Sequence, residues 1–192
     1  MERSTARRLW TWVPLFGAFV VAWAVLSIPG VQSYLTLQGA PPLATAAAVD
    51  APVLGADLVF TCADGSTFNG EDLRGKPAVI TVFAMWCPPC MAEVPTIESL
   101  HAAVGDKATV LLVALDSAED LHQWVQSSGR SASMYATVSE YPTPLDTTAI
   151  PMSVVLDPQG RLVSKITGAY TWDDPLVMEH IDLLAAEASV VN

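Results

Sequence analysis

The sequence has little charge and few basic side chains. Charged residues make up 15% of the 192 residues, and Lys and Arg number 9 against 20 for Asp and Glu. The net charge of -11 is the wrong sign for nucleic-acid phosphates or for a basic patch that docks on anionic lipid. We therefore expect no nucleic-acid partner, and we interpret the acidic surplus as a solvated surface.

Cysteine and histidine are also scarce, with three of each. Cys62, Cys87 and Cys90 are too few for a scaffold of disulfides. The histidines are scattered along the chain, so a zinc site, which needs a second Cys or His pair, is short of ligands. We expect no metal and no cofactor, and for Cys62 we expect a buried, inert thiol.

Apolar residues, in contrast, reach 52% of the chain and are concentrated near its start. Residues 9–29 contain no charged side chain, and about 20 such residues span the hydrocarbon core of a bilayer. Arginines precede this run, and the next charge after it is Asp50. This bias predicts a single-pass anchor in the cytoplasmic membrane, with residues 1–8 in the cytoplasm and the remainder in the periplasm or extracytoplasmic space.

A cleaved signal peptide is the alternative interpretation of the apolar run. Residues 44–46 and 46–48 both fit an A-x-A cleavage pattern. However, the run is longer than the apolar core of most signal peptides, and both sites lie well past its end. The length therefore favours an uncleaved anchor, and both interpretations place the following domain on the same side of the membrane.

The remainder of the chain predicts a linker over 30–52 and one α/β domain over 53–192 with a mixed β-sheet flanked by helices on both faces. The linker expectation comes from Ala, Pro and Gly with little periodicity. We expect strands over 58–62, 78–83, 109–115, 133–138, 152–156 and 162–166, with a short return at 67–68, and helices over 89–104, 117–127 and from 173 or 174 onward. The turn at 157–160, with Pro158 at its second position and Gly160 at its fourth, predicts a hairpin between the last two strands.

The motif Trp86-Cys87-Pro88-Pro89-Cys90 falls where a buried strand meets a helix. Unpaired N–H groups and the helix dipole stabilise a thiolate at a helix N-terminus, so a cysteine there becomes a nucleophile near neutral pH. Two intervening residues place the second sulfur within disulfide reach. Cys87 should attack and Cys90 should resolve the mixed disulfide. An inert structural disulfide and half of a zinc site are the alternatives.

Several further motifs extend this pattern into a family resemblance. Residues 84–90 with Pro95, the C-x-x-E-x-P pattern of 90–95, Ile150-Pro151, the turn at 157–160 and Gly168 with 172–175 resemble the thioredoxin superfamily. They resemble most closely its membrane-anchored, extracytoplasmic thiol–disulfide oxidoreductases of the TlpA/ResA type. The resemblance covers about residues 56–186 and implies a thioredoxin-like fold.

The resemblance also implies roles for individual residues. Cys87 and Cys90 would be the redox pair, and Glu93 would exchange a proton with Cys90; the i to i+3 spacing places both on one helix side. An ordinary exposed helix glutamate is the alternative for Glu93. Trp86 would pack beside the disulfide, with a plain core aromatic as the alternative. Pro151 would be cis and keep metal away, and the backbone of Ile150 would pair with an extended substrate chain.

Two positions depart from the family pattern. Thr81 stands six residues before Cys87, where thioredoxins carry a buried acid, so Glu93 is the acidic candidate in the motif. Residues 141–149 lack the Gly-rich approach to the proline that is usual in the family, which leaves the shape of the substrate groove open.

The direction of electron flow depends on which redox state is stabilised. Pro88 and Pro89 place no cationic side chain and no N–H between the sulfurs, which favours a reducing couple and a protein-disulfide reductase. Its clients would be exported proteins with disulfides, such as apocytochrome c or copper-site proteins, and its electrons would come from a membrane donor of the DsbD/CcdA type. A disulfide-forming oxidase and a non-catalytic copper-binding thiol module are the alternatives.

Overall fold

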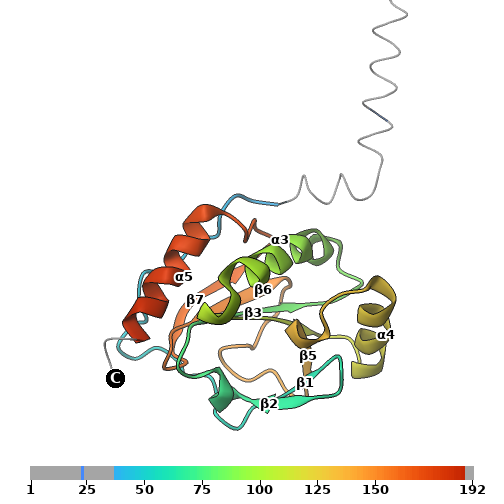
Figure 1. The fold of residues 1–192 in the computed structure, drawn as a ribbon, viewed down its shortest axis with the longest axis horizontal. Helices are drawn as coiled ribbons and strands as arrows, with labels where there is room; N and C mark the ends of the chain where they lie inside the picture. The colour runs from blue at the N-terminus through green and yellow to red at the C-terminus, as the bar shows by residue number, and fades with distance from the viewer. Residues whose placement is uncertain (1–22, 24–36, 189–192) are drawn as a thin grey trace, which may run out of the picture. The chain divides into compact units, whose positions relative to one another are not determined.

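The computed structural model describes residue 23 and residues 37–188 (Figure 1). The apolar run at 9–29 lies outside the described residues except for Trp23, so the membrane anchor stays a prediction. Within the part of the chain that is described, no helix is both long and apolar enough to cross a bilayer.

One seven-stranded mixed sheet forms the centre of the domain, in the order β2-β1-β5-β4-β3-β6-β7. Its three middle strands β5, β4 and β3 run parallel, and the remaining neighbours pair antiparallel. The buried apolar runs of the sequence form the parallel centre, because strands covered on both faces need apolar side chains throughout. The strands are β1 Val59–Cys62, β2 Thr67–Asn69, β3 Ala78–Phe83, β4 Thr109–Ala114, β5 Tyr135–Val138, β6 Met152–Leu156 and β7 Leu162–Thr167.

The helices begin and end at signals that the sequence contains. Ser117 caps α4 by accepting the amide of Asp120, and Gly129 ends it in the left-handed conformation, so the helix lies within one residue of the expected 117–127. The amide of Gly160 donates to the Asp157 carbonyl at 2.8 Å, which confirms the hairpin turn. The α-helices are α3 Pro88–Val104, α4 Ala118–Ser128 and α5 Pro175–Ala188, and the 3₁₀ turns are Gly70–Leu73, Gly105–Lys107 and Ala132–Met134.

The two faces of the sheet are covered differently, which corrects the expectation of helices on both. Apolar side chains from α3, α4 and α5 all join one core cluster, which includes Val79 and Phe83 of β3. The opposite cluster holds Ile80 and Val82 and is closed by loop residues, among them Leu145. Prolines in the 139–150 connection remove backbone N–H groups that a helix needs, so a loop covers this face (Figure 1).

The expected linker over 30–52 ends earlier than the sequence indicates, because the compact unit begins at Leu37. The amide of Gln38 donates to the Ala169 carbonyl at 3.0 Å, and the amide of Ala44 donates to the Ser164 hydroxyl at 2.7 Å. Ala40 and Leu43 pack against the helical core cluster. A composition of Ala, Pro and Gly shows no periodicity here because the segment runs across the domain surface without regular secondary structure.

Candidate active site

Cys87 and Cys90 lie at the junction of β3 and α3 and form a disulfide, with their Cα atoms 5.3 Å apart. Cys87 is the N-cap of α3, and its sulfur accepts the amide of Cys90 at 3.3 Å. Cys87 is slightly more exposed than Cys90, at 5% against 1%, which suits the expected roles of attacking and resolving cysteine. The outer sulfur therefore sits at the positive end of the helix dipole, where a thiolate is stabilised.

Pro88 and Pro89 form the first turn of α3 between the two cysteines. Proline suits this position because the first helical amides have no acceptor within the helix. It also removes two of the N–H groups that would otherwise point at a thiolate on Cys87. The amide of Cys90 is the donor that the structure gives to the Cys87 sulfur.

Pro151 lies beside the disulfide, after a cis peptide bond from Ile150. The cis bond confirms the expectation from the family resemblance. The carbonyl oxygen of Ile150 is 4.0 Å from the Cys87 sulfur, so the backbone before the proline borders the reactive atom. β6 begins directly after this bond and pairs with β3, the strand that precedes the C-x-x-C motif. This pairing holds Pro151 near the two cysteines.

Glu93 is buried, with 1% of its surface exposed, which contradicts the alternative of an exposed helix glutamate. Its Oε1 accepts the amide of Tyr170 at 3.1 Å and the indole N–H of Trp172. Burial, opposed by these two hydrogen bonds, raises its pKa to about 7. Glu93 lies one helical turn after Cys90, and a pKa near neutral pH is the property that proton exchange at a thiol requires.

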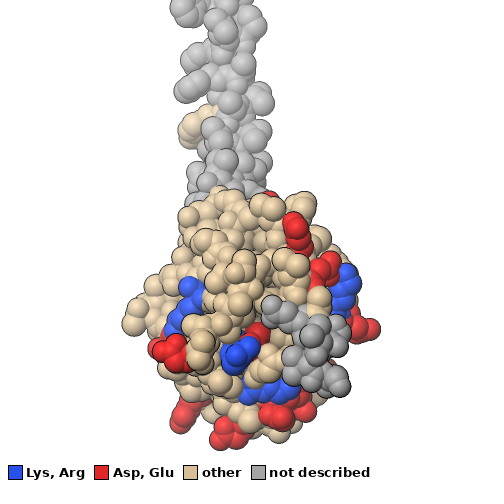
Figure 2. All heavy atoms as spheres, turned by 90° about the vertical axis from the view of Figure 1, so that its left-hand side faces the viewer, with Lys and Arg blue, Asp and Glu red and all other residues tan. Residues whose placement is uncertain are grey.

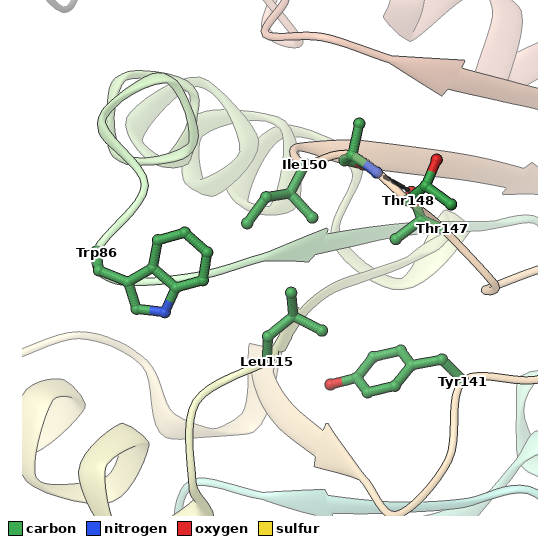
Figure 3. A pocket seen from close by; sticks show the side chains of 7 residues that line it. Trp86, Leu115, Tyr141, Thr147, Thr148 and Ile150 are labelled. Carbon is green, nitrogen blue, oxygen red and sulfur yellow. Dashed lines mark hydrogen bonds between the residues drawn. The ribbon is translucent and has the colours of Figure 1, made fainter.

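Trp86 is 69% exposed, so the alternative of a plain core aromatic is wrong. It faces a pocket of about 250 Å³ across from Leu115, Tyr141 and Ile150, with threonines at one side (Figure 3). The hydroxyl of Tyr141 donates to the Ala114 carbonyl at 2.6 Å, which anchors this wall of the pocket to the end of β4. An apolar, partly open hollow therefore lies next to the redox pair.

Sequence reasoning did not find Tyr170, Trp172, Leu115 or Tyr141 as site residues. Trp172 belongs to the motif that supports the family resemblance, and its complete burial was a signal available only in three dimensions. Leu115 and Tyr141 come from two separate connections, and no spacing in the sequence relates them to Cys87.

Thr81, at the position of the family's buried acid, is fully buried and shares a 2.7 Å hydrogen bond with the hydroxyl of Ser153. The two hydroxyls satisfy each other's hydrogen bonds in the buried sheet, and neither side chain is ionisable. Cys62 is buried, as expected, and burial raises the pKa of its thiol, so it is a poor nucleophile.

The surface carries no uniform charge on the face drawn in Figure 2, where Lys and Arg lie among Asp and Glu. Ion pairs with carboxylates engage Arg74, Lys107, Arg130, Arg161 and Lys165. Most basic side chains of the described residues are therefore compensated locally by carboxylates.

A strand, a C-x-x-C cap on the following helix and a cis-proline opposite it are the geometry of a thioredoxin-like redox site. The sequence model of the AhpC/TSA family, which is thioredoxin-like, matches residues 49–172. The chain belongs to this family.

Several relatives of this AhpC/TSA chain are named thiol–disulfide oxidoreductase ResA. It is 27% identical to the thiol–disulfide oxidoreductase ResA of Bacillus cereus over 127 residues, which are 60% of this chain and 68% of that one. It is 31% identical to the thioredoxin-like protein YneN of Bacillus subtilis, over 37% of this chain and 42% of the relative. The matched segment thus spans less than half of the YneN protein.

Solved structures agree on the fold of the AhpC/TSA chain. The structure of MTB dsbF in its mixed oxidised and reduced forms superposes with a TM-score of 0.53 at 26% identity, over 68% of this chain and 98% of that one. The pneumococcal lipoprotein thioredoxin Etrx1 of Streptococcus pneumoniae has a TM-score of 0.54 at 23% identity, over 66% and 99%. The thioredoxin-like α/β fold expected from the sequence is confirmed.

Proposed function

We propose that this chain is a protein-disulfide reductase that exchanges thiols and disulfides through Cys87 and Cys90. The observation that carries the proposal is the Cys87–Cys90 disulfide at the N-terminus of α3, with the carbonyl oxygen of Ile150, next to cis-Pro151, 4.0 Å from the outer sulfur. The relatives named thiol–disulfide oxidoreductases support the class of reaction.

The reaction begins from the reduced pair. The Cys87 thiolate attacks one sulfur of a client disulfide, breaks the client S–S bond and forms a mixed disulfide, and the released client thiolate takes up a proton. Cys90 then transfers its proton to Glu93 and attacks the Cys87 sulfur. A Cys87–Cys90 disulfide forms, the second client thiolate leaves, and two electrons have passed to the client.

The reducing direction follows from the first turn of α3. A thiolate at an N-cap is stabilised by the amides that follow it, and Pro88 and Pro89 supply none. The reduced form of Cys87 thus gains less from the helix than it would with ordinary residues there. A less stabilised reduced state gives a more reducing couple, which suits donation of electrons to clients.

Location and partners follow from the apolar run at 9–29. An anchor there, preceded by arginines, would hold the domain outside the cytoplasmic membrane. That compartment is oxidising, so a reductase needs a membrane electron donor of the DsbD/CcdA type. The clients would be exported proteins with disulfides, with apocytochrome c and copper-site proteins as the candidates, so that cytochrome c maturation is one process it would serve.

The pocket beside Trp86 supports a protein client rather than a small disulfide. Its walls are mostly apolar and its opening reaches Ile150, whose backbone would pair with an extended client chain. A large apolar side chain near the client cysteine would fill the hollow between Trp86 and Leu115.

The reduction potential of the purified full chain tests the proposal. We expect a value nearer about -270 mV, that of a reducing thioredoxin, than about -120 mV, that of a dedicated oxidase. In cells the pair should be mostly reduced and should become oxidised when the donor is removed. A potential at the oxidising end with a mostly oxidised pair in cells would instead establish a disulfide-forming oxidase. Loss of all exchange in Cys87→Ser is the control for the site itself.

A further inference from the structure

Residues 169–172 follow β7 as an extended segment whose two edges contact different partners. On one edge, the amide of Tyr170 donates to Glu93 and the amide of Trp172 donates to the Thr96 hydroxyl at 3.2 Å. Alternate backbone groups of an extended chain point to opposite sides, so the amides of 170 and 172 both face α3. The indole of Trp172 adds a second donor to Glu93 Oε1.

The other edge of this segment contacts residues 37–43, which we call the strap. Gln38 donates its amide to the Ala169 carbonyl at 3.0 Å, and the amide of Thr171 donates to the Gly39 carbonyl at 3.3 Å. The hydroxyl of Thr171 also donates to the Gln38 carbonyl at 3.1 Å. These bonds form a short parallel bridge outside the seven-stranded sheet. The 169–172 segment is therefore held between the strap and α3.

We propose that the strap is a positioning element for the site, which holds Tyr170 and Trp172 on Glu93 and so fixes the carboxyl that serves Cys90. Its catalytic consequence rests on the proposed function, whereas its structural part does not. The strap is also the segment through which the apolar N-terminal run joins the domain, so the same residues would link attachment of the domain to its proton-exchanging group.

The arrangement of the two carboxyl oxygens of Glu93 supports this role. Oε1 accepts both donors from the 169–172 segment, while Oε2 is buried and has no hydrogen-bond partner among the described residues. A buried carboxylate oxygen without a donor is costly, so Oε2 is the atom that carries the proton. Loss of that proton leaves a charge stabilised on Oε1 by the two donors that the strap holds in place.

Other titratable groups near α3 do not account for the behaviour of Glu93. The titratable groups on the elements around Glu93 are Cys90 on the same helix, Tyr170 on the 169–172 segment and His180 on α5, which packs against α3. Burial raises the pKa of Glu93, the hydrogen bonds from Trp172 and Tyr170 lower it, and no charged group of the described chain is among the causes of its shift. The burial of Glu93 and the two hydrogen bonds from the 169–172 segment therefore set its proton affinity.

The test is a pH titration of the Glu93 carboxyl by ¹³C NMR in the full-length chain with its disulfide intact. Trp172→Phe removes one donor while the site stays buried, so the titration should move up by about one pH unit. Gln38→Pro removes the amide that holds Ala169, and Thr171→Val removes the hydroxyl bond to the strap. Both should loosen the segment and weaken the two hydrogen bonds to Oε1, which moves the titration up, in the same direction as Trp172→Phe.

Ser164→Ala is the matched control, because it deletes the hydrogen bond from Ala44, which directly follows the strap and does not contact residues 169–172 through this bond. We expect no change in its titration. Thr171→Val preserves shape and keeps the test decisive if Gln38→Pro does not fold. A titration at the wild-type pH in both strap variants would overturn the proposal, and so would an unmoved titration in Trp172→Phe.

The same variants separate this inference from the proposed function. With reduced full-length chain and insulin as the disulfide substrate, the break in the pH–rate profile should move with the NMR titration in each variant. If the wild-type chain reduces no disulfide but the titrations shift as described, the strap positions Glu93 and the proposed function is wrong. If exchange occurs and its break follows Trp172→Phe but ignores both strap variants, the function stands and the strap proposal fails.

Discussion

The sulfur of Cys87 lies 4.0 Å from the carbonyl oxygen of Ile150, across the gap between the start of α3 and the cis bond to Pro151. The first atom of the redox pair that a client meets is thus bordered by backbone that can pair with an extended chain. Cys90 lies one turn deeper and is 1% exposed, so Cys87 is the more accessible sulfur of the pair.

Replacement of Cys90 by Ser should leave Cys87 linked to its client as a mixed disulfide. The reason is that the resolving thiolate is the group that releases the client. The measurement is recovery of the adduct from cells under non-reducing conditions and identification of the attached protein. Cys87→Ser is the paired variant and should trap nothing. Cys62→Ser should behave as wild type, and an adduct that depended on Cys62 would contradict the assignment.

Glu93→Gln should change how stability depends on pH. The pKa of Glu93 is raised from 4.5 to about 7 in the folded chain, so the folded state holds a proton that the unfolded state has released. The free energy of unfolding contributed by this group is therefore full below pH 4.5 and falls as pH rises toward 7, by up to about 3 kcal/mol. Glutamine does not titrate, so the variant should lack this fall.

Denaturant unfolding of the oxidised full-length chain at a series of pH values measures this difference. The same variant should slow disulfide exchange and remove the break near pH 7 from its rate profile, because Cys90 loses its proton acceptor. Parallel stability curves for wild type and Glu93→Gln between pH 4.5 and 7 would show that the carboxyl does not titrate as described.

Much of this fold could be predicted because local signals and burial agree. The apolar run at 78–83 is β3, and Ser117 with Asp120 sets the start of α4 within one residue. The C-x-x-C spacing brings its two sulfurs together within a single helical turn, so the redox pair depends on no distant contact. These features are short-range, and short-range chemistry can be read directly from sequence.

Other features depend on contacts between distant segments. The strap lacks periodicity, and its role becomes visible only where Gln38 meets Ala169, 131 positions later. Glu93 could be placed on the helix side of Cys90, but its burial depends on Trp172, which no spacing rule relates to it. The loop at 139–150 replaces an expected helical cover because prolines interrupt it, and its fit over the sheet is a tertiary property.

Thr81→Val should destabilise the fold without affecting the redox chemistry. Thr81 and Ser153 satisfy each other's hydroxyls in the centre of the sheet, and valine leaves the serine hydroxyl buried without its partner. We expect a loss of about 1–3 kcal/mol in the free energy of unfolding. The reduction potential and the pH profile should stay at their wild-type values, since neither hydroxyl titrates. A shifted pH profile would show that this pair takes part in proton transfer.

The pocket beside the disulfide predicts that Trp86 discriminates between clients. Trp86→Ala should slow the reduction of a protein disulfide about tenfold, which corresponds to about 1.4 kcal/mol of lost contact energy. The reduction of oxidised glutathione should stay unchanged, because a small disulfide does not reach the far wall of the pocket at Leu115. Leu176→Ser is the matched control, since Leu176 is also a large exposed side chain, at 66%, but lies on α5. Steady-state kinetics with both substrates measure the effect. Equal losses for the two substrates would mean that Trp86 acts on the disulfide itself, and a loss in Leu176→Ser of the same size would mean that general surface hydrophobicity, not the pocket, binds the client.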